Sequence, residues 1–239
     1  MPTTLILEYA ELNTMKIVFS IGGSILAPEG VDGDYVGKVS SFLSGISEGN
    51  EVAVVVGGGR PAREKISVAR AKGASWAECD HVGILATREN ARVLADALGD
   101  LAVEAIPESI HEAASLFGDR ILVMGGTEPG HSTDAVACLL ADWVKADLFV
   151  NASNVDAVYD KNPWENDDAK PLEEISVDDL IVLLEGEGMN AGEYPLLDHV
   201  ALKVIKRSSI RTLVLDGRDL GNMRSAIEGR PFKGTSVVS

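Results

Sequence analysis

Short apolar runs alternate with longer amphipathic segments along almost the whole chain. This alternation is typical of βαβ units, in which helices connect parallel strands. The run Val52–Val56 is apolar at every position, as expected of a strand that helices cover on both faces. We therefore predict an α/β fold, a three-layer αβα sandwich around a mainly parallel sheet.

The apolar runs and the amphipathic segments also give the bounds of the expected elements. The expected strands are Lys16–Ile21, Glu51–Val56, Leu101–Ile106, Arg120–Met124, Asp147–Asn151 and Arg211–Asp216. The expected helices are Tyr35–Ile46, Pro61–Lys72, Glu78–Leu98, Ser109–Leu116, Thr133–Val144, Val177–Glu185, Asp198–Ser208 and Leu220–Glu228. The polar stretch Asp160–Pro171 is interpreted as a functional surface loop.

No linker rich in Pro, Gly or Ser divides the chain, so residues 15–239 are interpreted as a single domain. Residues 1–14 precede a second methionine, Met15, which stands directly before the first expected strand. These residues are either a real N-terminal extension or the product of a misassigned start, and we favour Met15 as the true start.

The charge of the chain excludes several classes of partner. Lys and Arg number 21 and Asp and Glu number 37, so the formal net charge is −16. Such a chain offers no basic surface to nucleic acid or to an anionic membrane, and we expect neither partner. No apolar run reaches the roughly 18 residues that span a bilayer, and no signal peptide is recognised, so a cytoplasmic location is expected. The excess of carboxylates resembles that of halophilic proteins, because molar salt shortens the Debye length to about 3 Å.

The residues themselves predict no metal-ligand cluster. Cys79 and Cys138 lie inside expected helices and lack CxxC or Cys/His spacing. We therefore expect both thiols to be buried core groups, and the ligands of any metal stay unknown at this point.

Three expected strands end in glycine clusters: Gly22-Gly23-Ser24, Gly57-Gly58-Gly59 and Gly125-Gly126-Thr127. In a doubly wound sheet, ligands bind at the carboxyl ends of the strands. Glycine there lets backbone N–H groups approach phosphate oxygens, and the next helix adds its positive N-terminus. Neither GxxxxGK[ST] nor a well-placed GxGxxG is present, so phosphate recognition must follow another pattern.

The order of four segments carries a family resemblance. The segments are Ile21-Gly22-Gly23-Ser24, Val56–Gly59, Gly125–Ala137 (GGTEPGHSTDAVA) and Asn154–Asp160 (NVDAVYD). They resemble the amino acid kinase superfamily, and within it the archaeal-type uridylate (UMP) kinases, from Met15 to Ser236. Asp80–Ile84 and the segment Gly125–Ala137 are the most specific parts of the resemblance.

This resemblance implies a fold, a reaction and an assembly. The implied reaction transfers the γ-phosphoryl group of ATP to UMP, giving UDP and ADP in pyrimidine nucleotide biosynthesis, with Mg²⁺ as cofactor. UMP and ATP are the implied small-molecule partners, and a homo-oligomer, a hexamer built from dimers, is the implied assembly. Residues 15–132 would form mainly the acceptor-binding half and residues 133–239 mainly the ATP-binding half.

The resemblance also implies which residues bind the acceptor. Arg63 follows the triple-glycine loop by one helical turn, where its guanidinium group could clamp a monophosphate; the alternative is a solvated surface arginine. Arg60 is a second, weaker candidate. Asp80 would accept hydrogen bonds from ribose hydroxyls, or would simply cap the helix that it begins. The full implied UMP set is Gly58, Gly59, Arg63, Asp80, Thr127, Ser132 and Thr133.

Phosphoryl transfer asks for positioning and for positive charge around the migrating group. By resemblance, Asp134 organises that charge, although its place at a helix start also fits a cap. It is not a general base, because a nucleoside monophosphate is already largely ionised at neutral pH. The expected catalytic set is Asp134, the amides of Gly22 and Gly23, and Lys203, which could equally be a solvated helix residue.

For the ATP site, the segment Asn154–Pro163 matches the family's NVDGVYxxDP. The expected ATP-binding residues are Gly22, Gly23, Ser24, Asn154, Tyr159, Asp160 and Pro163, and Asp156, Lys161 and Asp198 match neighbouring family positions. Two departures put the fine geometry in question: Ala157 replaces a glycine and Asn162 replaces an aspartate.

A further departure concerns charge. Much of the superfamily has a lysine where this chain has Ser20, and Lys16 lies about 13 Å back along the same strand. Neutralisation would therefore fall to Mg²⁺, Arg63 and either Lys203 or Lys161. Two alternatives stay open: another small-molecule kinase of the family, such as isopentenyl phosphate kinase, and a non-catalytic nucleotide sensor or storage protein.

Overall fold

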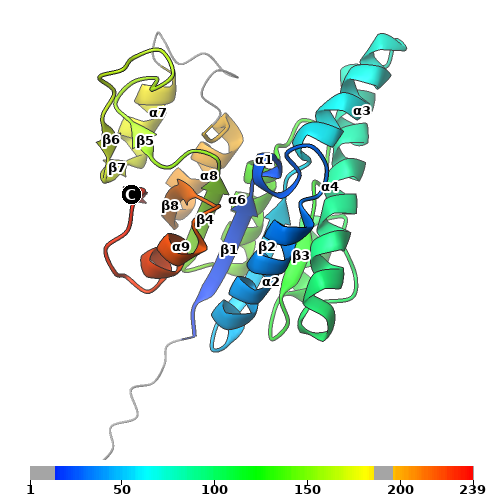
Figure 1. Cartoon of the computed structure of the whole chain (residues 1–239), viewed down its shortest axis with the longest axis horizontal. Coiled ribbons are helices and arrows are strands. Elements are labelled where there is room, and N and C mark those ends of the chain that lie inside the picture. Colours follow the sequence, from blue (N-terminus) through cyan, green and yellow to red (C-terminus); the bar gives the residue numbers. More distant parts are fainter. Residues whose placement is uncertain (1–13, 186–195, 239) are drawn as a thin grey trace, which may run out of the picture.

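The computed structural model describes residues 14–185 and 196–238 (Figure 1). The question of a start at Met1 or Met15 concerns a segment that, apart from Thr14, lies outside the described residues. Within the described part of the chain, no helix combines the length and the apolar character that crossing a membrane requires.

One seven-stranded sheet forms the middle layer, in the order β3-β2-β1-β4-β8-β9-β7. Strands β1 to β4 and β8 pair in parallel, as the sequence predicts, whereas β9 runs antiparallel to β8. A separate pair, β5 and β6, lies at the β7 end of the molecule (Figure 1). The strand bounds are β1 Lys16–Ile21, β2 Glu51–Val56, β3 Leu122–Met124, β4 Leu148–Ser153, β5 Val158–Tyr159, β6 Pro171–Leu172, β7 Glu174–Ser176, β8 Arg211–Asp216 and β9 Thr235–Val238.

Helices cover both faces of this sheet, which confirms the predicted three-layer αβα sandwich. One core cluster joins the sheet to α1, α2, α4 and α9, and the other joins it to α5, α6, α7 and α8. Helix α3 packs along α4 and buries only Gly59 and Ala62, so this pair projects from one end of the molecule (Figure 1). The helix bounds are α1 Gly23–Leu26, α2 Gly33–Ser47, α3 Gly59–Ala71, α4 Trp76–Leu98, α5 Ile110–Leu116, α6 Thr133–Val144, α7 Val177–Glu185, α8 His199–Ser208 and α9 Leu220–Ile227.

Local sequence fixes where several helices begin. Asp32, Ser75, Ser132 and Asp198 each accept hydrogen bonds from backbone N–H groups of the first turn that follows. At α4 the cap is reciprocal, because the Glu78 carboxylate also accepts a hydrogen bond from the Ser75 backbone N–H. The cap of α6 fixes its start beside the ends of β1 and β4, where Asp134 contacts Ser20 and Asn151, and the start of α8 lies next to it through the contact of Asp198 with Ser132.

The expected strand Leu101–Ile106 is wrong. A 3₁₀ turn takes up Gly99–Leu101, and only Ala102 forms a bridge, to Ile121. Pro107 has no N–H to donate, so little chain remains between the turn and the proline to extend the edge of the sheet. The outer strands β7 and β9 and the small pair β5 and β6 were not predicted.

Candidate functional site

Two glycine loops meet backbone to backbone at the carboxyl edge of the sheet. A Cβ atom on Gly23 would lie 2.0 Å from the Gly59 amide nitrogen, and one on Gly57 would lie 2.4 Å from the Gly23 nitrogen. Gly59 also has a φ of +68°, which favours glycine. The clusters after β1 and β2 are therefore needed for this close approach, whatever else their N–H groups bind.

Side chains of α4 fix the third glycine loop, Gly125-Gly126-Thr127, through hydrogen bonds. The Thr87 hydroxyl accepts a hydrogen bond from the Gly126 N–H (2.7 Å) and donates to the Ile84 carbonyl (2.6 Å). The Arg88 guanidinium donates to the carbonyls of Gly126 (3.1 Å) and Thr127 (3.4 Å). Its side chain is only 15% exposed and also pairs with Glu108, so α4 determines the position of this loop.

A cavity of about 490 Å³ opens between these loops, α3 and α4. Six of the seven predicted acceptor residues line it: Gly58, Gly59, Arg63, Asp80, Ser132 and Thr133. Thr127 is not among the lining residues and is 7% exposed. The sequence analysis did not assign the other residues that line the cavity, which are Ala62, Ile66, Gly83, Ile84, Thr87, Gly126, Gly130 and His131.

The two charged residues of this cavity have different surroundings. Arg63 is exposed and forms no ion pair within the described residues, whereas Arg60 is already paired with Glu29 and Glu64, both at 2.8 Å. Asp80 accepts a hydrogen bond from the Gly130 N–H (2.9 Å). The capping interpretation of Asp80 is wrong, because α4 begins four residues earlier and Ser75 caps it.

Asp134 lies at the start of α6, and it is not the cap either. Ser132 holds that position, since its Oγ accepts a hydrogen bond from the Ala135 N–H. One Asp134 oxygen, Oδ1, accepts hydrogen bonds from the Ser20 hydroxyl (2.6 Å) and from the Asn151 amide (2.9 Å). Strands β1 and β4 bring these donors together, because Ser20 pairs with Asn151 in the parallel register.

The pKa of Asp134 is raised to about 6, chiefly by burial and also by the Asp198 carboxylate, while the hydrogen bonds from Ser20 and Asn151 oppose the rise. Its side chain is still partly exposed to solvent. Asp198, the cap of α8, accepts a hydrogen bond from the Ser132 hydroxyl. No lysine or arginine in the described ranges forms an ion pair with Asp134, and the predicted Lys203 lies exposed on α8.

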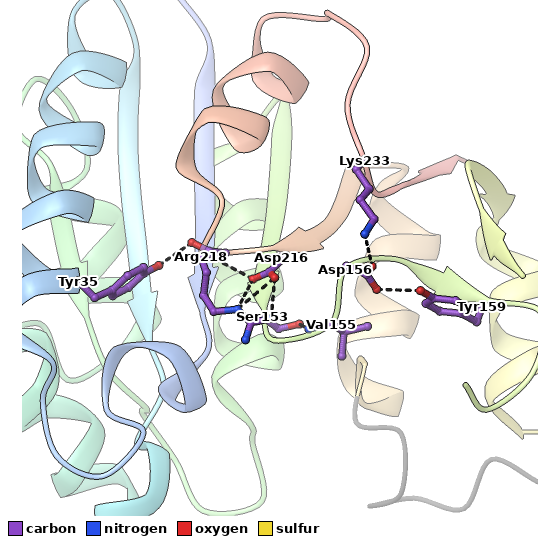
Figure 2. A network of polar contacts seen from close by, with 9 residues as sticks. Tyr35, Ser153, Val155, Asp156, Tyr159, Asp216, Arg218 and Lys233 are labelled. Atoms are coloured by element: carbon purple, nitrogen blue, oxygen red, sulfur yellow. Dashed lines mark hydrogen bonds and ion pairs between the residues drawn. The ribbon is translucent and has the colours of Figure 1, made fainter. Parts of the chain in front are cut away.

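Four of the predicted ATP-binding residues, Asn154, Tyr159, Asp160 and Pro163, lie in β5 and in the loops on either side of it. Figure 2 shows Asp156 between the Tyr159 hydroxyl (3.1 Å) and the Lys233 ammonium group (2.8 Å). Burial raises the pKa of Asp156, but hydrogen bonds from Lys233 and Tyr159 outweigh it and the net pKa is lowered. Sequence reasoning missed Lys233, because only the path of the chain after α9 brings it here.

Neighbouring groups extend this network toward β8. Arg218 makes a forked contact with Asp216, with distances of 2.8 Å from Nε and 2.6 Å from Nη2 (Figure 2). In the loop that follows β5, Asp160 Oδ1 accepts from the Lys170 N–H and Lys161 pairs with Asp168. Lys161 is therefore held within this loop by its ion pair with Asp168. Asn154 is exposed and Pro163 is half-buried.

The described residues contain no group of three or more His, Cys, Asp or Glu side chains placed to hold a metal ion. Cys79 and Cys138 are free and buried, as predicted.

The comparisons with known proteins point to one family. The model of the amino acid kinase family matches residues 15–216. The chain is 45% identical over 226 residues to the uridylate kinase of Methanobrevibacter smithii, covering 94% of this chain and 100% of that protein. It is 44% identical over 206 residues to that of Methanocaldococcus jannaschii, covering 85% and 91%.

A solved structure of an archaeal uridylate kinase has a similar fold. The uridylate kinase of Archaeoglobus fulgidus superimposes with a TM-score of 0.84 at 39% identity, over 94% of this chain and 100% of that one. The family model covers most of the sequence and the archaeal relatives match nearly end to end. The chain belongs to the amino acid kinase family.

Proposed function

We propose that this protein is a UMP kinase, which transfers the γ-phosphoryl group of ATP to UMP and gives UDP and ADP. The observation that carries the proposal is the cavity that Arg63, Asp80 and the Gly125–Thr133 loop share with the triple-glycine loop. The names of the archaeal relatives supply the substrate, since relatives at 42–45% identity are uridylate kinases.

The acceptor fits this cavity by charge and by size. Arg63 is the cation free to bind a monophosphate there, because Arg60 is paired with two glutamates. The amides of Gly58 and Gly59 add donors at the start of α3. Asp80 uses Oδ2 to hold Gly130, so Oδ1 is the atom that accepts ribose hydroxyls. Ser132 and Thr133 line the same cavity. Thr127 contributes through the position of its loop, where Arg88 holds its carbonyl.

Donor binding and transfer occur across β1 and β4. The Gly22 N–H is held by the Ala152 carbonyl and fixes the loop, so the amides of Gly23 and Ser24 at the start of α1 are the ones that face the ATP phosphates, with Lys203 approaching from α8. Asn154, Tyr159, Asp160 and Pro163 line the nucleoside end. Asp134 stands between the two halves, residues 15–132 and 133–239, and organises charge there.

Mg²⁺ is the cofactor in this proposal, and the residues present fit it. In kinases the ion is held by one or two carboxylates together with substrate phosphates rather than by a full protein cage. A site with Asp134 and without a three-carboxylate cluster among the described residues is of that type. When bound, the ion neutralises phosphate charge; Asp134 is the carboxylate that would hold it.

A coupled ADP-release assay tests the proposal. Purified protein with ATP and Mg²⁺ is offered UMP, CMP, dTMP, isopentenyl phosphate and N-acetylglutamate in parallel. UMP should give the highest kcat/KM by at least tenfold. Turnover of isopentenyl phosphate alone would favour the related kinase, and binding of ATP and UMP without turnover would favour the sensor.

Four expectations from sequence remain predictions: the hexamer, the cytoplasmic location, the place in pyrimidine nucleotide biosynthesis and the halophilic character. Sedimentation analysis tests the first. The last is tested by stability in salt, as described below.

A further inference from the structure

Asn151 has a buried oxygen without a partner. The side chain is 2% exposed, and its amide nitrogen donates to Asp134 Oδ1. Its other terminal atom, Oδ1, is the one buried side-chain polar atom among the described residues that has no hydrogen-bond partner. A buried acceptor left unsatisfied costs about 1–3 kcal/mol, so such atoms in native proteins are usually satisfied by a water or an ion.

The Asn151 side chain belongs to a cluster of oxygen-bearing side chains. The Asn151 amide and the Ser20 hydroxyl converge on Asp134 Oδ1, within 2.9 Å and 2.6 Å. Asp134 Oδ2 is engaged by neither of these bonds, and the nearest influential charge is a second carboxylate, that of Asp198. The cluster therefore combines a carboxylate, an amide oxygen and a hydroxyl with no cationic side chain bound to it in the described ranges.

We propose that Ser20, Asp134 and Asn151 bind one monovalent cation of the potassium type, at the point where β1, β4 and α6 meet. The ligand set has a single formal negative charge and two neutral oxygens. Mg²⁺ keeps most of its water and prefers carboxylates and phosphates. Potassium exchanges its hydration shell for neutral carbonyl oxygens more readily, which suits the buried Asn151 Oδ1.

The bound cation has a mechanical and an electrostatic effect. It satisfies Asn151 Oδ1 and thereby ties β4 to α6 at the edge of the sheet. It also puts a fixed positive charge beside the Gly22-Gly23 loop, whose first amide is held by β4 through the Gly22 N–H and the Ala152 carbonyl (2.9 Å). Binding at this place does not depend on the proposed function; only an effect on turnover does.

Crystals of the full chain grown in rubidium chloride test the binding directly, because rubidium replaces potassium and scatters anomalously. The expected result is an anomalous peak within coordination distance of Asn151 Oδ1 and Asp134. Ordinary water density there with no anomalous signal overturns the proposal. A manganese peak in place of rubidium at Asn151 Oδ1 would also overturn it, since that site would then be divalent; manganese at Asp134 away from Asn151 Oδ1 belongs to the proposed Mg²⁺ and leaves the rubidium result to decide.

A solution experiment adds a functional readout. Potassium chloride replaces N-methylglucamine chloride at constant ionic strength, and both thermal unfolding and turnover are followed. Potassium should raise the unfolding midpoint of the wild-type protein and increase turnover about tenfold, the equivalent of one charge-assisted contact. Equal values in the two salts contradict the site.

Two variants locate the effect at the cluster. Ser20→Lys places an ammonium group in the site, so the response to potassium should be lost while the protein stays folded. Ser41→Ala, an exposed position on α2, is the control and should keep the full response. If Ser20→Lys does not fold, Ser20→Ala should weaken the potassium response, and the rubidium crystals still decide. A protein that binds rubidium but phosphorylates no acceptor would overturn the proposed function and leave the cation site standing.

Discussion

Replacing Asp134 with asparagine should stabilise the protein while it reduces activity. The pKa of Asp134 is raised from 3.8 to about 6. Each pKa unit corresponds to about 1.4 kcal/mol, so ionising the buried carboxylate costs up to about 3 kcal/mol at neutral pH. Partial exposure to solvent reduces this to about 1–3 kcal/mol. Asparagine keeps Oδ1 as the acceptor for Ser20 and Asn151 and carries no charge.

The pH dependence has a definite sign. The unfolded chain loses the Asp134 proton near pH 4, whereas the folded protein keeps it until about pH 6. The contribution of this group to the free energy of unfolding is therefore fully present below pH 4, falls between about pH 4 and pH 6, and stays low above that. Asp134→Asn removes this fall, so its advantage over the wild type should grow across the same window.

Thermal unfolding in potassium-free N-methylglucamine buffer, from pH 4 to pH 8, measures this difference. A gain of about 1–3 kcal/mol raises the midpoint by about 2–12 °C at pH 8 in a chain of this size. Turnover should fall by at least a hundredfold with little change in either KM, because the charge is needed in the transition state.

A second aspartate of the same helix gives a control of opposite sign. The Ser208 hydroxyl and Arg207 lower the pKa of Asp142 against the effect of burial, so Asp142→Asn should lose stability at neutral pH and recover as the pH falls. A variant Asp134→Asn that unfolds no higher than the wild type at pH 8, with the same pH profile, would refute the desolvation reasoning. Near-normal turnover would remove Asp134 from the chemistry.

Three further predictions follow from the same structure. Arg63→Ala should raise the KM for UMP by about 10–100-fold with an unchanged KM for ATP in steady-state kinetics, because a charge-assisted phosphate contact is lost. Arg60 is already paired with two glutamates, so Arg60→Ala should change either KM little. Arg88→Ala should release the carbonyls of Gly126 and Thr127 and raise the KM for UMP more than it lowers kcat. Arg92→Ala, at a residue that donates to the Glu104 carbonyl away from this loop, should not; equal effects of the two would deny Arg88 a positioning role. The unfolding midpoint should rise steeply between about 0.1 M and 2 M KCl but not in an osmotically matched neutral osmolyte, since screening relieves the repulsion of a −16 chain; equal midpoints would rule out salt adaptation.

The central strands could be predicted from sequence because burial on both faces leaves a local signal. The expected bounds of β1, β2 and β8 agree with those observed, and β4 begins one residue later and ends two residues later than expected. Strand β9 has no such signal: four residues, Thr235–Val238, are held by long-range pairing with β8 and β7. Leu101–Ile106 shows the opposite error, an apolar run prevented from pairing by its flanking turn and proline.

The site could be predicted as a set of loops but not as a set of contacts. Glycine clusters after three strands point to a ligand edge, yet nothing local says that Gly23 and Gly57 touch. Nor does anything local say that Ser20 and Asn151 share the Asp134 carboxylate, because that depends on the register of β1 against β4. One error was avoidable: the pair Ser75 and Glu78 has the spacing of a capping box, which already places the start of α4 before Asp80.

The acidity of the chain and the proposed cation site predict different responses to salt: the first depends on ionic strength and the second on the identity of the cation. Screening of a −16 surface is served by any monovalent salt, so the part of the stabilisation that is due to screening should be equal in sodium chloride and potassium chloride. The cluster of Ser20, Asp134 and Asn151 selects by ion size and by the cost of dehydration, so sodium should not replace potassium there. The negative field of the chain also concentrates cations near its surface, and even a site of low intrinsic affinity is then occupied. A stability and a turnover that both rise more in potassium than in sodium at equal ionic strength would show the cation site acting beside the surface effect; values that follow ionic strength regardless of the cation would leave only the surface effect.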